Sequence, residues 1–471
     1  MRNEYPLFLG NNPISDSEKF KIECPFDNSI IGLVNKANQN HIETAIDKAE
    51  KVFKITRMMP AYKRAQTLNN IAKDIQERSD ELSKILALEC GKNINFARGE
   101  VQRAFQTFTI ASEECKRIEG EFFSLDSTKK GEGKSALVKR FPIGPILGIT
   151  PFNFPLNLVA HKVAPALAVG NPITIKPSSL APISALLLAE IVTKYVPDGM
   201  LSVLPCSGLE IEQAVKDPRI KMISFTGSPP VGWRLKEICS KKKICLELGG
   251  NAGLILDKDC DIEDAISKTI IGGFAYAGQV CIHTQRIYVH EKIYVSFVSK
   301  FIEKIKELKS GHPLDENVFL NSMITETEAI RAKKWVNEAV DSGAKILCGG
   351  ERKGNNFSAT VLTDTTPDMK VEAKEIFAPV VAINSFKDFK DAVEMVNNTI
   401  YGLQAGVFSN NMKNIFYAFE NLEVGGVIIN DVPTFRVDQM PYGGIKNSGF
   451  GREGVKYAME EMTEMKLMVI G

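Results

Sequence analysis

Residues 146–176 read ILGITPFNFPLNLVAHKVAPALAVGNPITIK, and this stretch decides the fold. Ile146–Thr150 is a short apolar run with β-branched residues, which is typical of a buried strand, and Pro172–Lys176 is a second such run. Leu156–Val169 between them has the length and spacing of a helix. A strand, a helix and a strand joined by short connections predict a parallel βαβ unit. Ligands of such sheets bind at the carboxyl ends of the strands.

The same alternation continues along the chain. Ser184–Tyr195 has a helical pattern, and strands are expected at Ser202–Leu204 and Met222–Phe225. A second run follows Gly249, with expected strands Gly253–Leu256, Arg286–Val289, Val380–Ser385, Gly406–Phe408 and Gly426–Asn430, and expected helices Lys292–Lys309 and Ala329–Ser342. The sequence therefore predicts an α/β protein with two doubly wound domains.

The flanking segments differ from this pattern. Residues 40–125 read as a helical lead-in, with apolar residues on one face and charges on the other. A polar, exposed turn is expected at Ser127–Lys134, followed by a strand at Ala136–Phe141. The end of the chain, Thr463–Val469, alternates weakly and is expected to pair with another strand.

Composition excludes several classes of partner. The 471 residues carry 58 Lys and Arg against 57 Asp and Glu, which gives no reason to expect a nucleic acid or an anionic membrane as a partner. Leu158–Ile175, the most apolar long stretch, is broken by charge and proline, and the polar amino terminus does not resemble a signal peptide, so we expect a cytoplasmic protein without membrane spans. Nine scattered cysteines and only five histidines favour neither disulfides nor a metal site.

Cys281 and Glu247 are the first candidates for chemistry. Cys281 follows Gly278-Gln279-Val280, and Glu247 precedes Leu248-Gly249-Gly250, so glycine-rich backbone surrounds a nucleophile and a possible base. A buried inert cysteine and a strand-end ion pair are the structural alternatives. Asn153, between aromatic residues and prolines, is suited to donate to an oxyanion or to stabilise a turn.

Two further segments suggest a nucleotide site. Gly227 and Ser228 follow the strand at 222–225 and precede an expected helix, which suits a pyrophosphate, although such turns often need glycine for geometry alone. Lys176 ends a strand of the same sheet and can donate to ribose hydroxyls, or can be a solvated lysine. The Gly-x-Gly-x-x-Gly match at 449–454 lacks a preceding apolar strand, so we interpret it as an ordinary glycine-rich loop.

Together these segments resemble the aldehyde dehydrogenase superfamily. The resemblance rests on motifs in family order over nearly the whole chain: PFNFP (151–155), KPS (176–178), FTGS (225–228), ELGGN (247–251), GQVC (278–281), EIFAP (375–379) and PYGGIKNSG (441–449). It implies that Cys281 attacks an aldehyde, that the Asn153 amide and the Cys281 backbone N–H hold the oxyanion, and that Glu247 activates water to hydrolyse a thioester. The product is a carboxylic acid and no metal is needed.

The resemblance also implies a nicotinamide coenzyme. The residues expected to hold it are Ile149, Thr150, Pro151, Phe152, Lys176, Ser178, Ser179, Gly227, Ser228, Leu248, Glu375 and Phe377. Ser179 departs from the family pattern, because members that prefer NAD often carry a glutamate there that repels a 2′-phosphate. The coenzyme is therefore expected to be NAD or NADP, with a lean toward NADP or dual use.

Within the superfamily, residues 101–120 and 435–440 resemble the branch of lactaldehyde dehydrogenases and non-phosphorylating glyceraldehyde-3-phosphate dehydrogenases. Arg103, Phe154, Ile282 and Phe435 are the expected substrate residues, and Arg103 matches a phosphate-binding arginine of the latter enzymes. Lactaldehyde or another short 2-hydroxy aldehyde is the first expectation, and succinate semialdehyde and glyceraldehyde 3-phosphate are the alternatives. A cysteine hydrolase lacks its usual histidine base here, and a non-catalytic paralogue would not need Cys281, Glu247 and Asn153.

The family architecture implies a division of the chain. Residues 1–121 and 142–248 are expected to form the cofactor-binding domain, and residues 249–440 the catalytic domain. Residues 122–141 and 455–471 are expected to form a small β bridging element through which copies of the chain associate as a homodimer or homotetramer.

Overall fold

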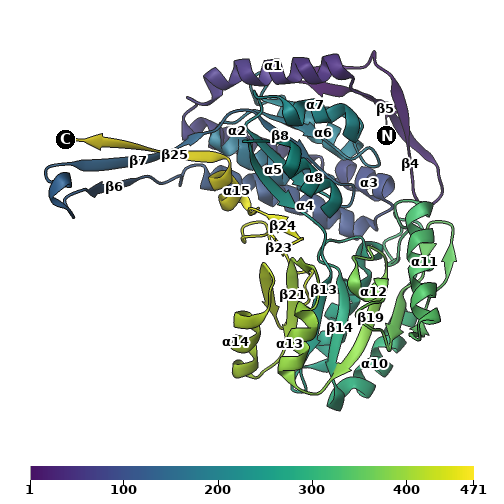
Figure 1. Ribbon diagram of the computed structural model, residues 1–471. Helices are drawn as coiled ribbons and strands as arrows, with labels where there is room; N and C mark the ends of the chain where they lie inside the picture. Colours follow the sequence, from purple (N-terminus) through teal and green to yellow (C-terminus); the bar gives the residue numbers. More distant parts are fainter. Residues whose placement is uncertain (1) are drawn as a thin grey trace.

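The molecule consists of two β-sheets, each covered by helices, and a narrow projecting arm (Figure 1). The computed structural model describes residues 2–471. This architecture confirms the predicted fold class. Among residues 2–471, every helix is too short or too polar to cross a lipid bilayer.

The first sheet has eight strands in the order β24-β12-β11-β8-β9-β10-β2-β3. Its five central strands are parallel: β8 (Ile146–Ile149), β9 (Ile173–Lys176), β10 (Leu201–Val203), β11 (Met222–Thr226) and β12 (Lys243–Glu247). The chain runs outward from β8 to β10 and then returns to β11 on the other side of β8. The switch point between β8 and β11 is where such sheets bind ligands.

Helices cover both faces of this sheet because its strands are apolar on both sides. Ile146 of β8 packs into the core beneath α2–α6, and the next residue, Leu147, packs into the core beneath α1, α7 and α8. The helix after β8, α5, ends where Gly170 adopts a left-handed conformation with φ 90°. The helices of this unit are α1 (Gln39–Thr56), α2 (Ala61–Glu77), α3 (Ser79–Cys90), α4 (Ile94–Glu114), α5 (Asn157–Val169), α6 (Ile183–Val192), α7 (Gly208–Lys216), α8 (Pro229–Ile238) and α15 (Val455–Glu461).

The second sheet has seven strands in the order β15-β18-β19-β14-β13-β21-β22, and all neighbours are parallel except β15 and β18. The strands are β13 (Ala252–Leu256), β14 (Thr284–His290), β15 (Lys345–Cys348), β18 (Thr360–Thr363), β19 (Val380–Phe386), β21 (Gln404–Phe408) and β22 (Gly426–Ile429). The helices are α9 (Ile262–Phe274), α10 (Glu291–Lys306), α11 (Glu326–Asp341), α12 (Lys370–Ala373), α13 (Phe389–Asn397) and α14 (Met412–Asn421). The predicted strands and helices of both runs are present within a few residues of their expected bounds.

The arm is an antiparallel sheet of β6 (Glu121–Ser124), β7 (Ser135–Pro142) and β25 (Thr463–Ile470), in the order β25-β7-β6. β25 pairs with β7 along its whole length, from Thr463 opposite Pro142 to Ile470 opposite Ser135. The arm projects away from both sheets and carries the carboxyl terminus near its tip (Figure 1).

One local expectation was wrong, and several short strands had no signal in the sequence. The helical lead-in ends at Glu114, and residues 121–124 form a strand instead. Short strands near the amino terminus lacked a sequence signal: β1 (Glu4–Tyr5), β2 (Leu7–Leu9), β3 (Asn12–Ile14), β4 (Lys19–Glu23) and β5 (Ile30–Asn35). The glycine-rich segment at 449–454 begins with a strand, β24 (Gly449–Phe450), that pairs antiparallel with β12. Tertiary pairing supplies the hydrogen bonds that such short segments cannot make alone.

Candidate active site

Three loops from different parts of the chain meet around one cavity of about 240 Å³. One loop follows β8 and carries Asn153, the second follows β12 and carries Leu248, and the third precedes β14 and carries Cys281. Glu247, the last residue of β12, lines the same cavity. The first sheet therefore supplies Asn153 and Glu247 from strand ends near its switch point, and the second α/β unit supplies the cysteine.

Asn153 is held rigidly against the loop that bears the cysteine. Its side-chain Nδ2 donates to the Gln279 carbonyl at 3.0 Å, and its Oδ1 accepts from the Phe154 amide at 3.1 Å. Its own carbonyl accepts from the buried Lys92 ammonium at 2.7 Å. The Asn153 amide is thus fixed beside the cavity by contacts to two other segments.

Lys92 belongs to a fully buried ion pair. Its Nζ lies 2.5 Å from Glu100 Oε2, and the rings of Phe154 and Tyr276 lie 4.1 and 4.4 Å from the same nitrogen. Glu100 Oε1 accepts the backbone N–H groups of Leu156 and Asn157 at 3.0 and 3.1 Å. Lys92, just before α4, therefore fixes the Asn153 backbone, and Glu100, within α4, fixes the point where this loop enters α5.

Cys281 follows a tight 3-10 turn, Ala275–Gly278, whose geometry requires glycine at its end. Gly278 has φ +66°, and a Cβ there would lie 2.1 Å from the Ala378 carbonyl oxygen. The Cys281 sulfur faces the cavity and lies 3.1 Å from the Tyr442 hydroxyl. Burial raises the pKa of the Cys281 thiol to about 11, partly opposed by the Tyr442 hydrogen bond and the Arg436 charge.

Glu247 has an unusual environment for a carboxyl group. It is 3 % exposed, and both of its oxygens lack a hydrogen-bond partner among the described residues. Burial, followed by repulsion from Glu453, raises its pKa well above the ordinary value. Glu453 itself accepts from Lys162 at 2.8 Å, and the pKa of Glu453 is lowered to about 2 because the nearby cations outweigh its burial. Of the two neighbouring carboxyls, Glu247 is the one that holds a proton more readily.

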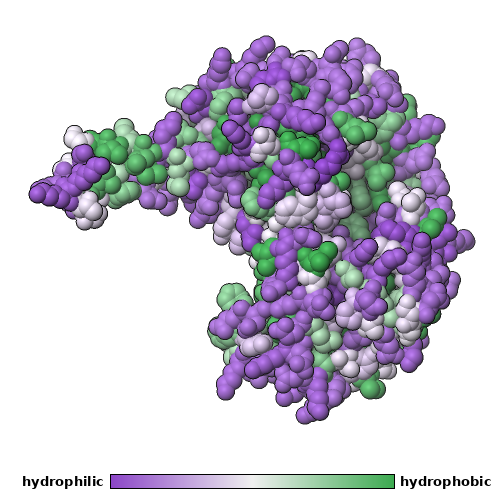
Figure 2. Space-filling view, viewed as in Figure 1, coloured by the Kyte–Doolittle hydropathy of each residue, from purple (hydrophilic) through white to green (hydrophobic). Residues whose placement is uncertain are grey.

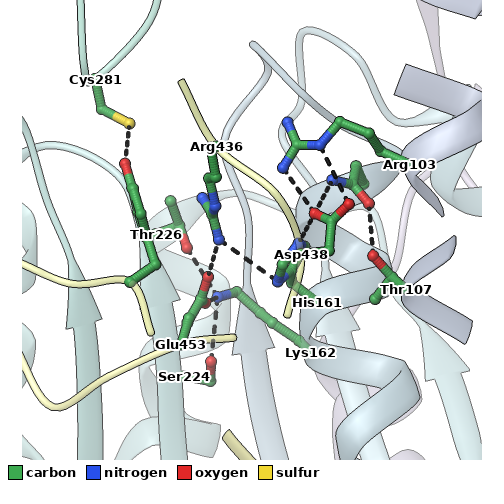
Figure 3. Close-up of polar contacts among 12 residues, drawn as sticks. Arg103, Thr107, His161, Lys162, Ser224, Thr226, Cys281, Arg436, Asp438 and Glu453 are labelled. Atoms are coloured by element: carbon green, nitrogen blue, oxygen red, sulfur yellow. Dashed lines mark hydrogen bonds and ion pairs between the residues drawn. The ribbon is translucent and has the colours of Figure 1, made fainter. Parts of the chain in front are cut away.

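Arg103 and Arg436 also line the cavity, and Figure 3 shows the polar contacts that they make. Arg103 pairs with the buried Asp438 at 2.7 Å, and Asp438 also accepts from Asn157 and contacts His161 at 2.7 Å. Arg436 is almost fully buried, and one terminal nitrogen makes two long contacts, 3.4 Å to Glu453 and 3.5 Å to His161. Its Nε has no partner among the described residues.

Around the cavity, Arg436 has no carboxylate partner of its own, because it shares Glu453 with Lys162. Lys162 is balanced by Glu453, and Arg103 is balanced by Asp438. Glu247, with its raised pKa, offers little negative charge. A buried, partly satisfied guanidinium attracts an anion or an electron-rich oxygen strongly, because it has lost its hydration.

The expected coenzyme residues fall into two groups. Pro151, Phe152, Gly227, Ser228, Leu248, Glu375 and Phe377 line the cavity together with the catalytic candidates. Ser228 is the N-cap of α8, and a Cβ on Gly249 would meet Glu375 Oε2 at 2.2 Å, so backbone and carboxylate approach closely there. Burial raises the pKa of Glu375 to about 7.

The second group lies farther along the same sheet edge. Ile149 and Lys176 end the paired strands β8 and β9, and burial lowers the pKa of Lys176. Thr150 is buried, and its hydroxyl has no hydrogen-bond partner among the described residues, so it is able to bind a polar group of a ligand. Ser178 accepts from the Leu180 amide, and the exposed Ser179 donates to the Cys206 carbonyl. These features fit a dinucleotide that extends from the cavity along the strand ends.

Of the expected substrate residues, Arg103, Phe154 and Ile282 line the cavity. Phe435 does not line it and is 44 % exposed. Sequence reasoning missed Arg436 and Tyr442, which sit in segments 435–440 and 441–449 that were quoted for the resemblance but not as site residues. A basic residue next to Phe435 was the only available signal for Arg436.

Comparison with known proteins agrees with this geometry. Residues 14–468 match the sequence profile of the Aldehyde dehydrogenase family. The chain belongs to the aldehyde dehydrogenase family. It is therefore an oxidoreductase that acts on aldehydes.

Three similar proteins illustrate the range of aldehyde dehydrogenases nearby. A 3-sulfolactaldehyde dehydrogenase of Priestia aryabhattai is 42% identical over 99% of this chain and 98% of its own. The structure of an aldehyde dehydrogenase from Physcomitrella patens in complex with the reaction product succinate is 44% identical, with TM-score 0.98 over 100% of this chain and 98% of that chain. Glyceraldehyde-3-phosphate dehydrogenase GapN from Methanocaldococcus jannaschii, complexed with NADP, is 40% identical, with TM-score 0.93 over 97% and 100%. These relatives agree with the predicted branch.

Proposed function

We propose that this chain oxidises a short aldehyde bearing an anionic group to the corresponding carboxylic acid, with NAD or NADP as hydride acceptor. The observation that carries the reaction is the common cavity wall of Cys281, Glu247 and Asn153. The observation that carries the anionic class is Arg436, a buried cation of that cavity that shares Glu453 with Lys162 and whose Nε has no partner among the described residues. Carboxylate, sulfonate and phosphate groups all suit a guanidinium. The relatives named above for succinate, 3-sulfolactaldehyde and glyceraldehyde 3-phosphate support this class.

In the proposed reaction, the Cys281 thiol gives its proton to solvent, the thiolate sulfur adds to the carbonyl carbon, and the carbonyl oxygen becomes an oxyanion. The Asn153 amide and the Cys281 backbone N–H donate to that oxyanion, which needs Asn153 to exchange its present acceptor, the Gln279 carbonyl. The oxidised coenzyme supplies the acceptor for the hydride that leaves the former carbonyl carbon. Glu247 in its ionised form then takes a proton from water, which attacks the thioester and frees Cys281 and the acid; its raised pKa makes it a stronger base once ionised.

For the coenzyme, we propose that Lys176, Gly227 and Ser228 contact the adenosine ribose and pyrophosphate, and that Glu375 and Phe377 hold the nicotinamide ribose. The supporting observations are the unpartnered Thr150 hydroxyl and the close approach of Gly249 to Glu375. The absence of a carboxylate at Ser179 leaves both NAD and NADP acceptable, with a lean toward NADP or dual use.

We further propose that copies of this chain associate through the arm, as a homodimer or homotetramer. β25 is an edge strand of eight residues, and edge strands of this length usually have a partner. Met465, Leu467, Met468 and Val469 are 62%, 56%, 51% and 51% exposed, and Figure 2 shows the apolar surface of the arm. We propose the same division of the chain into units. Residues 1–121 and 142–248 form the cofactor-binding domain, residues 249–440 the catalytic domain, and residues 122–141 and 455–471 the bridging element.

The test is a panel of four aldehydes, two with an anionic group and two without one. Initial rates of NAD and NADP reduction are measured with succinate semialdehyde, glyceraldehyde 3-phosphate, lactaldehyde and propanal, and Cys281→Ser is expected to abolish turnover while it still binds coenzyme. Glu247→Gln is expected to retain the first burst of reduced coenzyme and to slow later turnovers, because thioester hydrolysis loses its base.

Arg436→Met separates the anionic class from the alternatives. Loss of one charge-assisted contact is expected to lower kcat/KM for succinate semialdehyde by about 10- to 100-fold. Propanal has no anion, so its kcat/KM serves as the internal control and is expected to change much less. An equal loss for both aldehydes would mean that Arg436 acts on the fold or on Cys281 and does not bind an anionic group of the substrate. Lactaldehyde as the best wild-type substrate would favour the uncharged 2-hydroxy aldehyde instead.

A further inference from the structure

Tyr442 makes a polar contact with the proposed nucleophile that the reaction described above leaves unused. Its hydroxyl lies 3.1 Å from the Cys281 sulfur, and the tyrosine is 3 % exposed. The Tyr442 backbone is fixed by two hydrogen bonds to Glu453, of 3.0 and 2.7 Å, in an isolated antiparallel bridge. The backbone that carries the phenol is therefore held in place by these two hydrogen bonds.

Arg436 covers the ring of the same tyrosine. The guanidinium carbon lies 3.6 Å from the ring centroid, within the range of a strong cation–π contact. A cation over the ring draws electron density from the phenol and makes its O–H a better donor. Because burial raises the pKa of Tyr442 well above its ordinary value, the phenol keeps its proton at neutral pH and can donate it to an anionic sulfur.

The cysteine needs such help because its surroundings oppose ionisation. Four titratable groups face Cys281: Tyr442 and Arg436 favour the thiolate, whereas Glu375 and Glu247 oppose it. Glu247 has a raised pKa, so its opposition is weak while it is protonated. The hydrogen bond from Tyr442 is the one direct contact to the sulfur among the described residues.

We propose that Tyr442 is a further catalytic residue, which donates a hydrogen bond to the Cys281 sulfur as the thiolate forms, and that Arg436 positions and polarises it. The proposal rests on the role of Cys281 given under Proposed function. Addition of the sulfur to an aldehyde removes its negative charge, and the charge returns when the sulfur leaves during hydrolysis of the thioester. The hydrogen bond from Tyr442 therefore stabilises the sulfur both before addition and as it departs.

The test measures the sulfur directly, without aldehyde or coenzyme. The rate of alkylation of Cys281 by iodoacetamide is followed by peptide mass spectrometry from pH 6 to 10 in the wild type, Tyr442→Phe, Arg436→Met and the control Tyr457→Phe. Tyr457 lies on α15 and does not line the cavity. Coenzyme affinity of each variant checks that the fold is intact.

Tyr442→Phe is expected to slow alkylation about tenfold at pH 7.5 and to move the pH profile up by about one unit, as for loss of one hydrogen bond to a charged group. Arg436→Met is expected to move the profile in the same direction by a smaller amount, and Tyr457→Phe is expected to match the wild type. In turnover, Tyr442→Phe should lower both the burst rate and the rate of thioester hydrolysis, because the sulfur is anionic before addition and again as it leaves.

A Tyr442→Phe profile that superimposes on that of the wild type would overturn the proposal. A shifted profile in Tyr442→Phe with an unchanged one in Arg436→Met would overturn the part assigned to Arg436. The proposed reaction fails separately, because turnover by Cys281→Ser would refute it whatever the alkylation profiles show.

Discussion

Replacing the buried Lys92 by methionine tests how the Asn153 loop is held in place. Methionine has nearly the length and volume of the lysine stem, so the packing against Phe154 and Tyr276 is largely kept. The substitution removes the ammonium that lies 2.5 Å from Glu100 and 2.7 Å from the Asn153 carbonyl. It leaves Glu100 as a buried carboxylate without a counter-ion.

The expected loss in free energy of unfolding is about 3–5 kcal/mol, the range found when one member of a buried ion pair is removed. Most of this loss comes from the stranded charge. The double variant Lys92→Met/Glu100→Gln removes that charge and keeps an amide oxygen for the Leu156 and Asn157 N–H groups. It is therefore expected to be more stable than the single variant by at least about 2 kcal/mol.

The control is Arg98→Met on α4, the helix that carries Glu100. Arg98 pairs with Glu316 at 2.7 Å, but the two side chains are 50% and 60% exposed, so the loss should be at most about 1 kcal/mol. Unfolding in urea can be followed by Trp233 fluorescence in a Trp335→Phe background, because these are the two tryptophans of the chain. Trp233 lies in α8 of the unit that contains Lys92.

A functional readout accompanies the stability measurement. Displacement of the Asn153 amide by about 1 Å is expected to lower kcat about 100-fold, with a smaller change in KM. A free energy of unfolding for Lys92→Met within about 1 kcal/mol of the wild type would refute the reasoning. It would mean that removing the partner of Glu100 does not leave a costly buried charge. A double variant no more stable than the single would show that lost contacts, and not the unpaired charge, cause the effect.

Three further predictions concern the coenzyme and the assembly. Glu375, with a pKa of about 7, is mostly protonated at pH 6 and ionised at pH 8. Because a carboxylate accepts ribose hydroxyls better, calorimetric affinity for coenzyme should rise by up to about tenfold over that range and stay flat in Glu375→Gln. Ser179→Glu should weaken binding of NADP at least about tenfold and leave NAD nearly unchanged, measured in the same titrations, because a carboxylate repels the 2′-phosphate. Leu467→Lys/Val469→Lys should give monomers in light scattering, whereas Lys466→Gln on the same strand should keep the wild-type mass.

The sequence by itself determined the fold class and predicted most of the residues that we propose for catalysis. Hydrophobic runs such as Ile146–Thr150 and their spacing from helical segments are local properties, so they predict a parallel sheet and the edge where ligands bind. Motif order then identified Cys281, Glu247 and Asn153, which the structure brings to one cavity. These residues are recognisable because each lies in a short stretch with an unusual composition of glycine, proline and aromatic residues.

Only the tertiary structure decided how these groups interact. Arg436 and Tyr442 come from the last segment of the chain, which returns to the first sheet as β24. The contact of Tyr442 with Cys281 and that of Arg436 with Tyr442 depend on this long-range pairing. The sequence likewise gave no indication that Lys92 and Glu100 form a buried pair beneath the Asn153 loop. Burial, partner and pKa are set by which distant segments pack together, and a one-dimensional pattern records only which segments are able to pack.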